Sequence, residues 1–118
     1  LLLGACVQAG QAGPFNAVDW ALASVDGQPA GYTATLNLGE SGRATGQAPC
    51  NRYSAELAHD ASTFKLGAIG ATRMACLQIK GEAEFFQALQ GVETYALASG
   101  ELTLTGGGHV MVFVQPIN

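Results

Sequence analysis

Charged side chains are scarce in this chain, and cations are the scarcest of them. Asp, Glu, Lys and Arg together make up 12% of the 118 residues, about half the share that is usual in soluble domains. The five cations are scattered along the sequence as Arg43, Arg52, Lys65, Arg73 and Lys80. A nucleic-acid-binding surface needs clustered cations to release counterions from phosphates. Because the chain has no such cluster and carries a net charge of −4, we expect no nucleic-acid partner.

Long apolar runs are also missing. None reaches the roughly 18 residues that a membrane-spanning helix needs. The chain is still 48% hydrophobic, and its length suits one domain with its own core but is too short for two. Its 16 glycines, together with many Ala and Thr residues, favour short strands joined by tight turns.

Only two histidines, His59 and His109, are available to assist the three cysteines. A catalytic thiolate needs a base and a group that orients that base, and nothing in the local sequence ties either histidine to a cysteine. The CxxC and HxxxH spacings typical of zinc sites do not occur. We therefore predict no catalytic residue, no metal site and no cofactor.

The carboxylates and the glycine run suggest no enzyme either. Acid–base catalysis on a glycosidic bond requires paired carboxylates across a cleft, whereas Glu82 and Glu84 lie at a predicted helix start. Asp26 and Asp60 lie in predicted turns. No helix pattern follows the glycines at 106–108, so we interpret them as a hairpin turn rather than a phosphate-binding loop.

The first cysteine has an explanation of its own. The chain opens LLLGAC, which resembles the end of a bacterial lipoprotein signal, with Cys6 as the residue that is lipidated. On this interpretation residues 1–5 are the remnant of the signal peptide. Residues 6–14 are the lipidated cysteine and an uncharged, flexible tether. The alternatives are a truncated ordinary signal or a vector scar.

Setting Cys6 apart leaves Cys50 in the stretch CNRYS and Cys76 in the stretch TRMAC. In an oxidising compartment such a pair becomes a disulfide. A closed loop of about 26 residues would stabilise the fold by roughly 3.5 kcal/mol in the chain-entropy model. We therefore predict a Cys50–Cys76 disulfide that brings the two stretches together.

Apolar and polar residues alternate along most of residues 15–118, which is the pattern of half-buried strands. The clearest case is 32–38, where Tyr32, Ala34, Leu36 and Leu38 share one face. The segment HVMVFV is apolar on both faces, which predicts a central strand or one covered by a helix. Further strands are predicted near 18–22, 44–48, 53–57, 64–68, 95–97 and 102–104, with turns at 26–27, 39–42, 59–60 and 106–108.

One segment departs from this alternation. In KGEAEFFQALQGV the apolar residues Phe85, Leu89 and Val92 recur at helical spacing, with Phe86 beside them. Acidic residues in the first turn and a glycine just after the segment favour a helix from Glu82 to Gln90. We expect its apolar face to pack against the sheet.

Several of these segments together resemble the META domain family, whose bacterial members include a heat-shock lipoprotein. The resemblance runs from Trp20 to about Phe113, most of the chain beyond the tether. It is carried by WALASVDG, GRATGQAPCNRYSA, TRMAC, EAEFFQAL and ELTLTG, of which CNRYS and TRMAC at this spacing are the most specific. The sequence departs from the family pattern at Pro49 and Ala55, where glycine is usual.

The resemblance implies an α+β fold that is mainly antiparallel β. It is a partly open, barrel-like sheet, for which we predict seven to eight strands, with one α-helix packed across it. This META-like domain would occupy residues 15–118. The resemblance implies no catalytic activity, because the family is characterised by its fold more than by any reaction.

The polar residues of the two cysteine stretches have two interpretations. They can satisfy buried backbone groups where the loops meet, with Asn51 in a left-handed conformation at the chain reversal. They can instead contact a ligand or partner at one end of the barrel. The residues concerned are Asn51, Arg52, Tyr53, Thr72 and Arg73.

Taken together, these observations predict a non-enzymatic lipoprotein domain of the bacterial envelope, anchored to the periplasmic face of the outer membrane. We expect a monomer that binds an envelope protein or supports outer-membrane integrity under stress. The alternative is a carrier that holds a small lipid-like ligand inside the barrel. An enzyme is the third and weakest interpretation.

Overall fold

The computed structural model describes residues 19–40, 42–77 and 79–115. One helix lies within these residues, α2 (Glu82–Gln90). The strands are β1 (Asp19–Val25), β2 (Gln28–Pro29), β3 (Thr35–Asn37), β4 (Arg43–Gln47), β5 (Arg52–His59), β6 (Phe64–Leu66), β7 (Gly70–Ala71), β8 (Thr94–Ala98), β9 (Glu101–Gly106) and β10 (His109–Val114).

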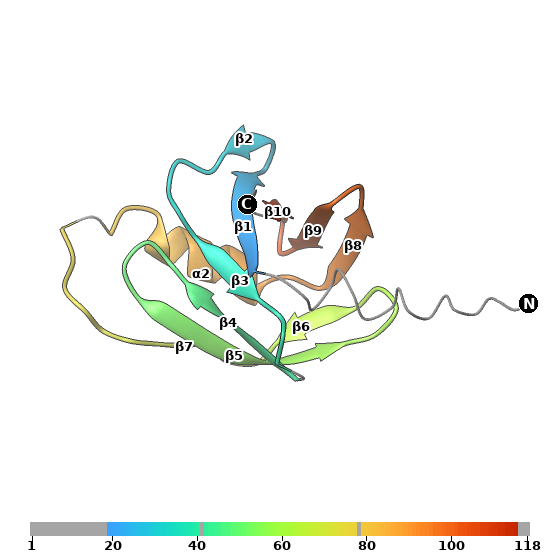
Figure 1. Ribbon diagram of the computed structural model, residues 1–118, viewed down its shortest axis with the longest axis horizontal. Coiled ribbons are helices and arrows are strands. Elements are labelled where there is room, and N and C mark those ends of the chain that lie inside the picture. Colours follow the sequence, from blue (N-terminus) through green and yellow to red (C-terminus); the bar gives the residue numbers. More distant parts are fainter. Residues whose placement is uncertain (1–18, 41, 78, 116–118) are drawn as a thin grey trace, which may run out of the picture.

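Eight of the strands follow one another in the order β6-β5-β4-β3-β1-β10-β9-β8, and every pairing is antiparallel. The two ends of this path approach each other. Thr63 and Thr94 form an isolated bridge, and the Phe64 N–H donates to the Glu93 carbonyl at 2.9 Å. The sheet is therefore a barrel with one unsealed seam between β6 and β8. Helix α2 lies across the barrel (Figure 1). This architecture confirms the predicted fold class.

The alternation in the sequence places the core side chains as expected. Tyr53, Ala55 and Leu57 of β5 are buried, as are Leu102 and Leu104 of β9. The strand that is apolar on both faces, β10, lies between β1 and β9 in the middle of the sheet, as predicted. The largest side chains with less than 2% exposure are Trp20, Phe64, Phe85, Phe113, Leu36, Leu89, Leu102, Leu104, Met111 and Val92.

The strand predicted over 32–38 is shorter in the structure, where β3 covers only Thr35–Asn37. The cause is the unpredicted strand β2, which folds back on β1 and pairs Ser24 with Pro29. This hairpin occupies the end of β1, so β3 pairs only with the first residues of β1. The inward faces are nevertheless as predicted, because Ala34, Leu36 and Leu38 are buried.

The helix has the predicted bounds, and its apolar face packs on the sheet. Phe85 and Leu89 are fully buried, and Phe86 is partly buried against the same core. The rings of Phe85 and Phe86 each lie 5.6 Å from the ring of Tyr53 in β5, edge to face. The aromatic contact therefore joins the helix directly to the strand that follows Cys50.

The last residue of the helix fills a break in the sheet. Strands β6 and β7 both pair with β5. Between them the Gly67 N–H still donates to the Glu56 carbonyl of β5 at 2.9 Å, but residues 68 and 69 lie outside the ladder. The Gln90 side chain accepts from the Ile69 N–H at 3.1 Å and donates to the Gly67 carbonyl at 2.7 Å. It also donates to the Leu66 carbonyl at 3.2 Å. A helix side chain thus takes the place of the missing strand partners.

The glycines at 106–108 form the predicted hairpin turn between β9 and β10. Gly106 has φ 157°, and a Cβ placed there would lie 2.3 Å from the Gly91 carbonyl oxygen. Glycine is needed at 106 because the turn packs closely against the chain leaving α2.

Within the described residues, no helix has both the length and the apolar character that crossing a membrane requires.

The burial of α2 predicts the effect of truncating its most buried leucine. Leu89→Ala removes a side chain with no exposed surface and should lower the free energy of unfolding by about 2–5 kcal/mol. Urea denaturation followed by circular dichroism measures this. Gln87→Ala, on the exposed side of the same helix, is the matched control and should be nearly neutral. Equal stabilities for the two variants would contradict the packing described.

Candidate functional site

The structure contains the predicted disulfide between Cys50 and Cys76, whose Cα atoms are 5.9 Å apart. Cys50 lies just before β5, and Cys76 lies in the loop between β7 and α2. The bond therefore joins CNRYS to TRMAC at one end of the barrel.

Asn51 is buried beside the disulfide and bonds to three separate parts of the chain. Its side-chain oxygen accepts from the Met74 N–H at 2.6 Å and from the Thr72 hydroxyl at 2.9 Å. Its carbonyl accepts from the Ala48 N–H at 2.8 Å. The expected left-handed backbone at Asn51 is wrong, because φ is positive at Asp26 and Ser99 alone among the described non-glycine residues. Asn51 acts through side-chain bonds to distant residues and through a backbone bond that closes the turn from Ala48.

The third part of the chain bonded to Asn51 is the start of α2, through the carboxylate of Glu82, its first residue. One Glu82 oxygen accepts from the N–H groups of Cys50 at 2.7 Å and Asn51 at 2.9 Å. The other accepts from the Asn51 side-chain amide at 2.7 Å. Burial raises the pKa of Glu82, but these three donors outweigh it and hold the pKa below its usual value of 4.5. Glu82 is therefore an ionised, buried anchor between the helix and the disulfide loop.

Tyr53 is also structural. Its phenol passes over Gly46 of β4 and donates to the Thr35 carbonyl of β3 at 2.6 Å. A Cβ on Gly46 would lie 2.2 Å from that carbonyl oxygen, so only glycine leaves room for the phenol. Burial raises the pKa of Tyr53, which keeps the phenol protonated as a donor. This bond replaces a backbone bond between β3 and β4, which pair only at Asn37 and Thr45.

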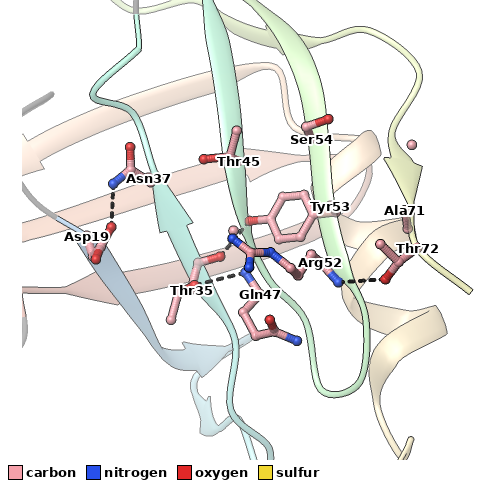
Figure 2. Close-up of a pocket in the computed structure, with 12 residues that line it drawn as sticks. Asp19, Thr35, Asn37, Thr45, Gln47, Arg52, Tyr53, Ser54, Ala71 and Thr72 are labelled. Carbon is pink, nitrogen blue, oxygen red and sulfur yellow. Dashed lines mark hydrogen bonds between the residues drawn. The ribbon is translucent and has the colours of Figure 1, made fainter. Parts of the chain in front are cut away.

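A groove of about 710 Å³ lies on the outer face of the sheet, where β3 and β4 separate. Most of the side chains that line it are polar, because outward residues of neighbouring strands meet there (Figure 2). Asn37 donates to the Asp19 carboxylate at one side, and the Gln47 N–H donates to the Thr35 hydroxyl at 3.0 Å. The polar side chains that line the groove are Asp19, Thr35, Asn37, Thr45, Gln47, Arg52, Ser54 and Thr72.

The structure separates the two arginines of the cysteine stretches. In Figure 2 the exposed Arg52 side chain points from β5 across β4 toward β3, over the groove. The ion pairs among the described residues, Arg43 with Glu40 and His109 with Asp26, do not involve it. Arg73 is exposed on the loop after β7 and does not line the groove.

Of the five residues predicted to contact a ligand, Asn51, Tyr53 and Thr72 therefore bond within the fold, whereas the Arg52 and Arg73 side chains face outward. The groove adds residues that the sequence did not single out, chiefly Asp19, Asn37 and Gln47. Their only signal was the run of polar residues at the outward positions of β3 and β4, with Asp19 at the start of β1. Cys6 lies outside the described residues.

The described residues contain no group of three or more His, Cys, Asp or Glu side chains arranged to hold a metal ion. What they form is a small β-barrel with one open seam, a single helix packed on the barrel, and a disulfide between two loops. A profile of the META domain matches residues 14–117. The chain belongs to the META domain family.

Two solved structures share this fold. An NMR structure of a protein from Burkholderia xenovorans is 23% identical, with a TM-score of 0.69, and the match covers 87% of this chain and 84% of that one. A second NMR structure is 22% identical, with a TM-score of 0.65, covering 83% of this chain and 88% of the other. No curated protein matches the chain significantly. At these identities the likeness concerns the fold alone.

The lowered pKa of Glu82 leads to a prediction about stability and pH. A carboxylate with a depressed folded-state pKa stabilises the fold above its unfolded value and loses that contribution as pH falls through the folded value. Glu82→Gln should therefore lower the free energy of unfolding at pH 7 by about 2–3 kcal/mol, because buried donors lose a charged acceptor. Below the ordinary pKa of 4.5 the difference from the wild type should shrink.

Urea titrations from about pH 3 to about pH 7, which bracket the ordinary carboxylate range, measure this difference. Glu84→Gln is the matched control, since Glu84 is exposed in the same helical turn. A constant difference between wild type and Glu82→Gln over the whole range would show that Glu82 does not act through its charge.

Proposed function

We propose that this META domain is a non-enzymatic binding module of the bacterial envelope, held at the outer membrane by a lipid on Cys6. Its binding surface is the polar groove over β3, β4 and β5. The observation that supports this proposal best is that the groove is open, outside the core, and carries an arginine without an ion pair among the described residues.

The chemistry of the groove favours a polar partner. Thr45 and Ser54 offer donors and acceptors, whereas the Gln47 amide nitrogen already donates to the Ala48 and Cys50 carbonyls. The Arg52 guanidinium suits a carboxylate in two-pronged geometry. An extended segment of an envelope protein would bond to the polar side chains through its backbone, and an acidic side chain in that segment would pair with Arg52. Through such a contact the domain would support outer-membrane integrity under stress.

A lipid carrier has less support. The space inside the barrel is occupied by large side chains with less than 2% exposure, among them Trp20, Phe113 and Met111. An internal ligand would have to displace them, at a cost that close-packed cores resist. The groove is the better-supported binding site.

The anchor rests on the sequence LLLGAC. Lipoprotein modification supplies a thioether-linked diacylglycerol and commonly an N-acyl chain, and two or more acyl chains hold a protein stably on a bilayer. Val7, in place of aspartate, follows the cysteine and is compatible with sorting to the outer membrane. The uncharged tether then keeps the domain close to that membrane.

Photocrosslinking in cells tests the groove. A photoreactive residue in place of Thr45 should crosslink to a discrete envelope protein, and Arg52→Gln in the same chain should abolish the adduct, because it removes the guanidinium but not the fold. Arg73→Gln is the matched control, since Arg73 is exposed nearby but outside the groove. An adduct that survives Arg52→Gln, or the absence of any adduct, would contradict the proposed binding surface.

Lipid labelling tests the anchor separately. Expressed with a complete signal, the wild type should partition with membranes and incorporate labelled palmitate, because Cys6 carries the acyl chains. Cys6→Ala should do neither. If both forms are equally soluble, LLLGAC is the remnant of an ordinary signal and the domain is not lipid-anchored.

A further inference from the structure

The loop between β7 and α2 carries a concentration of exposed apolar side chains. Leu77 is 99% exposed, and Met74 and Ile79 are each about half exposed. The other large exposed apolar residues of the described chain, Leu97 and Val110, lie on different strands. In Figure 1 the loop is the yellow segment that extends furthest from β8, β9 and β10.

The loop is held in shape on both sides of Leu77. Cys76, the neighbouring residue, is bonded to Cys50, and the Met74 N–H donates to the Asn51 side chain at 2.6 Å. The Ile79 carbonyl accepts from the Glu82 N–H at 3.2 Å. The described chain is therefore tied to the fold before and after Leu77, which lowers the entropy lost when the apolar side chains bind a surface.

The charged residues of the loop indicate the kind of surface that it binds. Arg73 and Lys80 flank the apolar residues, so two of the five cations of a chain with net charge −4 lie on this loop. Neither belongs to the ion pairs among the described residues. Apolar side chains between cations match an anionic bilayer, which accepts the apolar groups below its headgroups and pairs the cations with its phosphates. The acidic remainder of the chain would be repelled by the same surface.

We propose that this loop, defined by Arg73, Met74, Leu77, Ile79 and Lys80, docks on an anionic lipid surface with Leu77 inserted below the headgroups. The contact goes beyond the groove and does not depend on it. The chain between Cys6 and Asp19 can span at most about 45 Å, so a domain anchored at Cys6 stays within reach of the bilayer. The loop would fix the orientation that the tether alone leaves free.

Vesicle binding tests this proposal on the full chain carrying Cys6→Ser, so that no acyl chain contributes. The protein should sediment with vesicles of phosphatidylethanolamine and phosphatidylglycerol, and bind phosphatidylcholine vesicles roughly tenfold more weakly, because only the former attract the two cations. Leu77→Ser should weaken binding to the anionic vesicles by roughly tenfold. Lys80→Gln should weaken it about fivefold and leave binding to phosphatidylcholine unchanged.

Leu97→Ser is the matched control, an exposed leucine distant in the sheet, and it should bind as the parent does. Equal binding by the Leu77→Ser and Leu97→Ser variants would overturn the proposal, as would a parent chain that binds neither kind of vesicle. The proposal would also be overturned if the chain binds no vesicles but forms a dimer that Leu77→Ser dissociates. That result would assign the loop to contact with a second copy of the chain. If the loop does not bind lipid, the proposal for the groove still stands, because the Arg52→Gln crosslinking test examines that surface independently.

Discussion

The ionised carboxylate of Glu82 is the contact on which this end of the barrel depends. It accepts three hydrogen bonds from Cys50 and Asn51, and Asn51 in turn holds Thr72 and Met74. Helix, disulfide and loop are therefore linked through one buried charge. A buried carboxylate is tolerated only with such donors, so the helix start and the disulfide loop must both be in place before Glu82 can be buried as an anion. The covalent bond between the cysteines reinforces an arrangement that the hydrogen bonds already specify.

Much of the fold could be predicted from the sequence, because period-two alternation reports which face of a strand is buried. The helix was predicted to its residue bounds, since Phe85, Leu89 and the terminal glycine are local signals. The short β3 could not be predicted, because it follows from competition with β2 for the edge of β1. The role of Gln90 between β6 and β7 is equally nonlocal, since it depends on where the end of the helix meets the sheet.

Less of the site could be predicted from the sequence, because its contacts also join residues that are far apart along the chain. Glu82 was interpreted as a residue favourable to the helix dipole, and no sequence spacing indicates that its carboxylate bonds residues more than 30 positions away. Arg52 and Arg73 occur in similar contexts beside cysteines, yet strand pairing places one over a polar groove and the other on a projecting loop. The chemistry of a side chain can be named from sequence, but its direction is set by the neighbouring strands.

The pairing of β1 with β10 bears on the order of events during synthesis. These two strands come from opposite ends of the described chain, and they are neighbours in the middle of the sheet. Contacts of such long sequence separation form late, after the entropy of closing a large loop has been overcome. The barrel therefore cannot be completed until its last strand has left the ribosome.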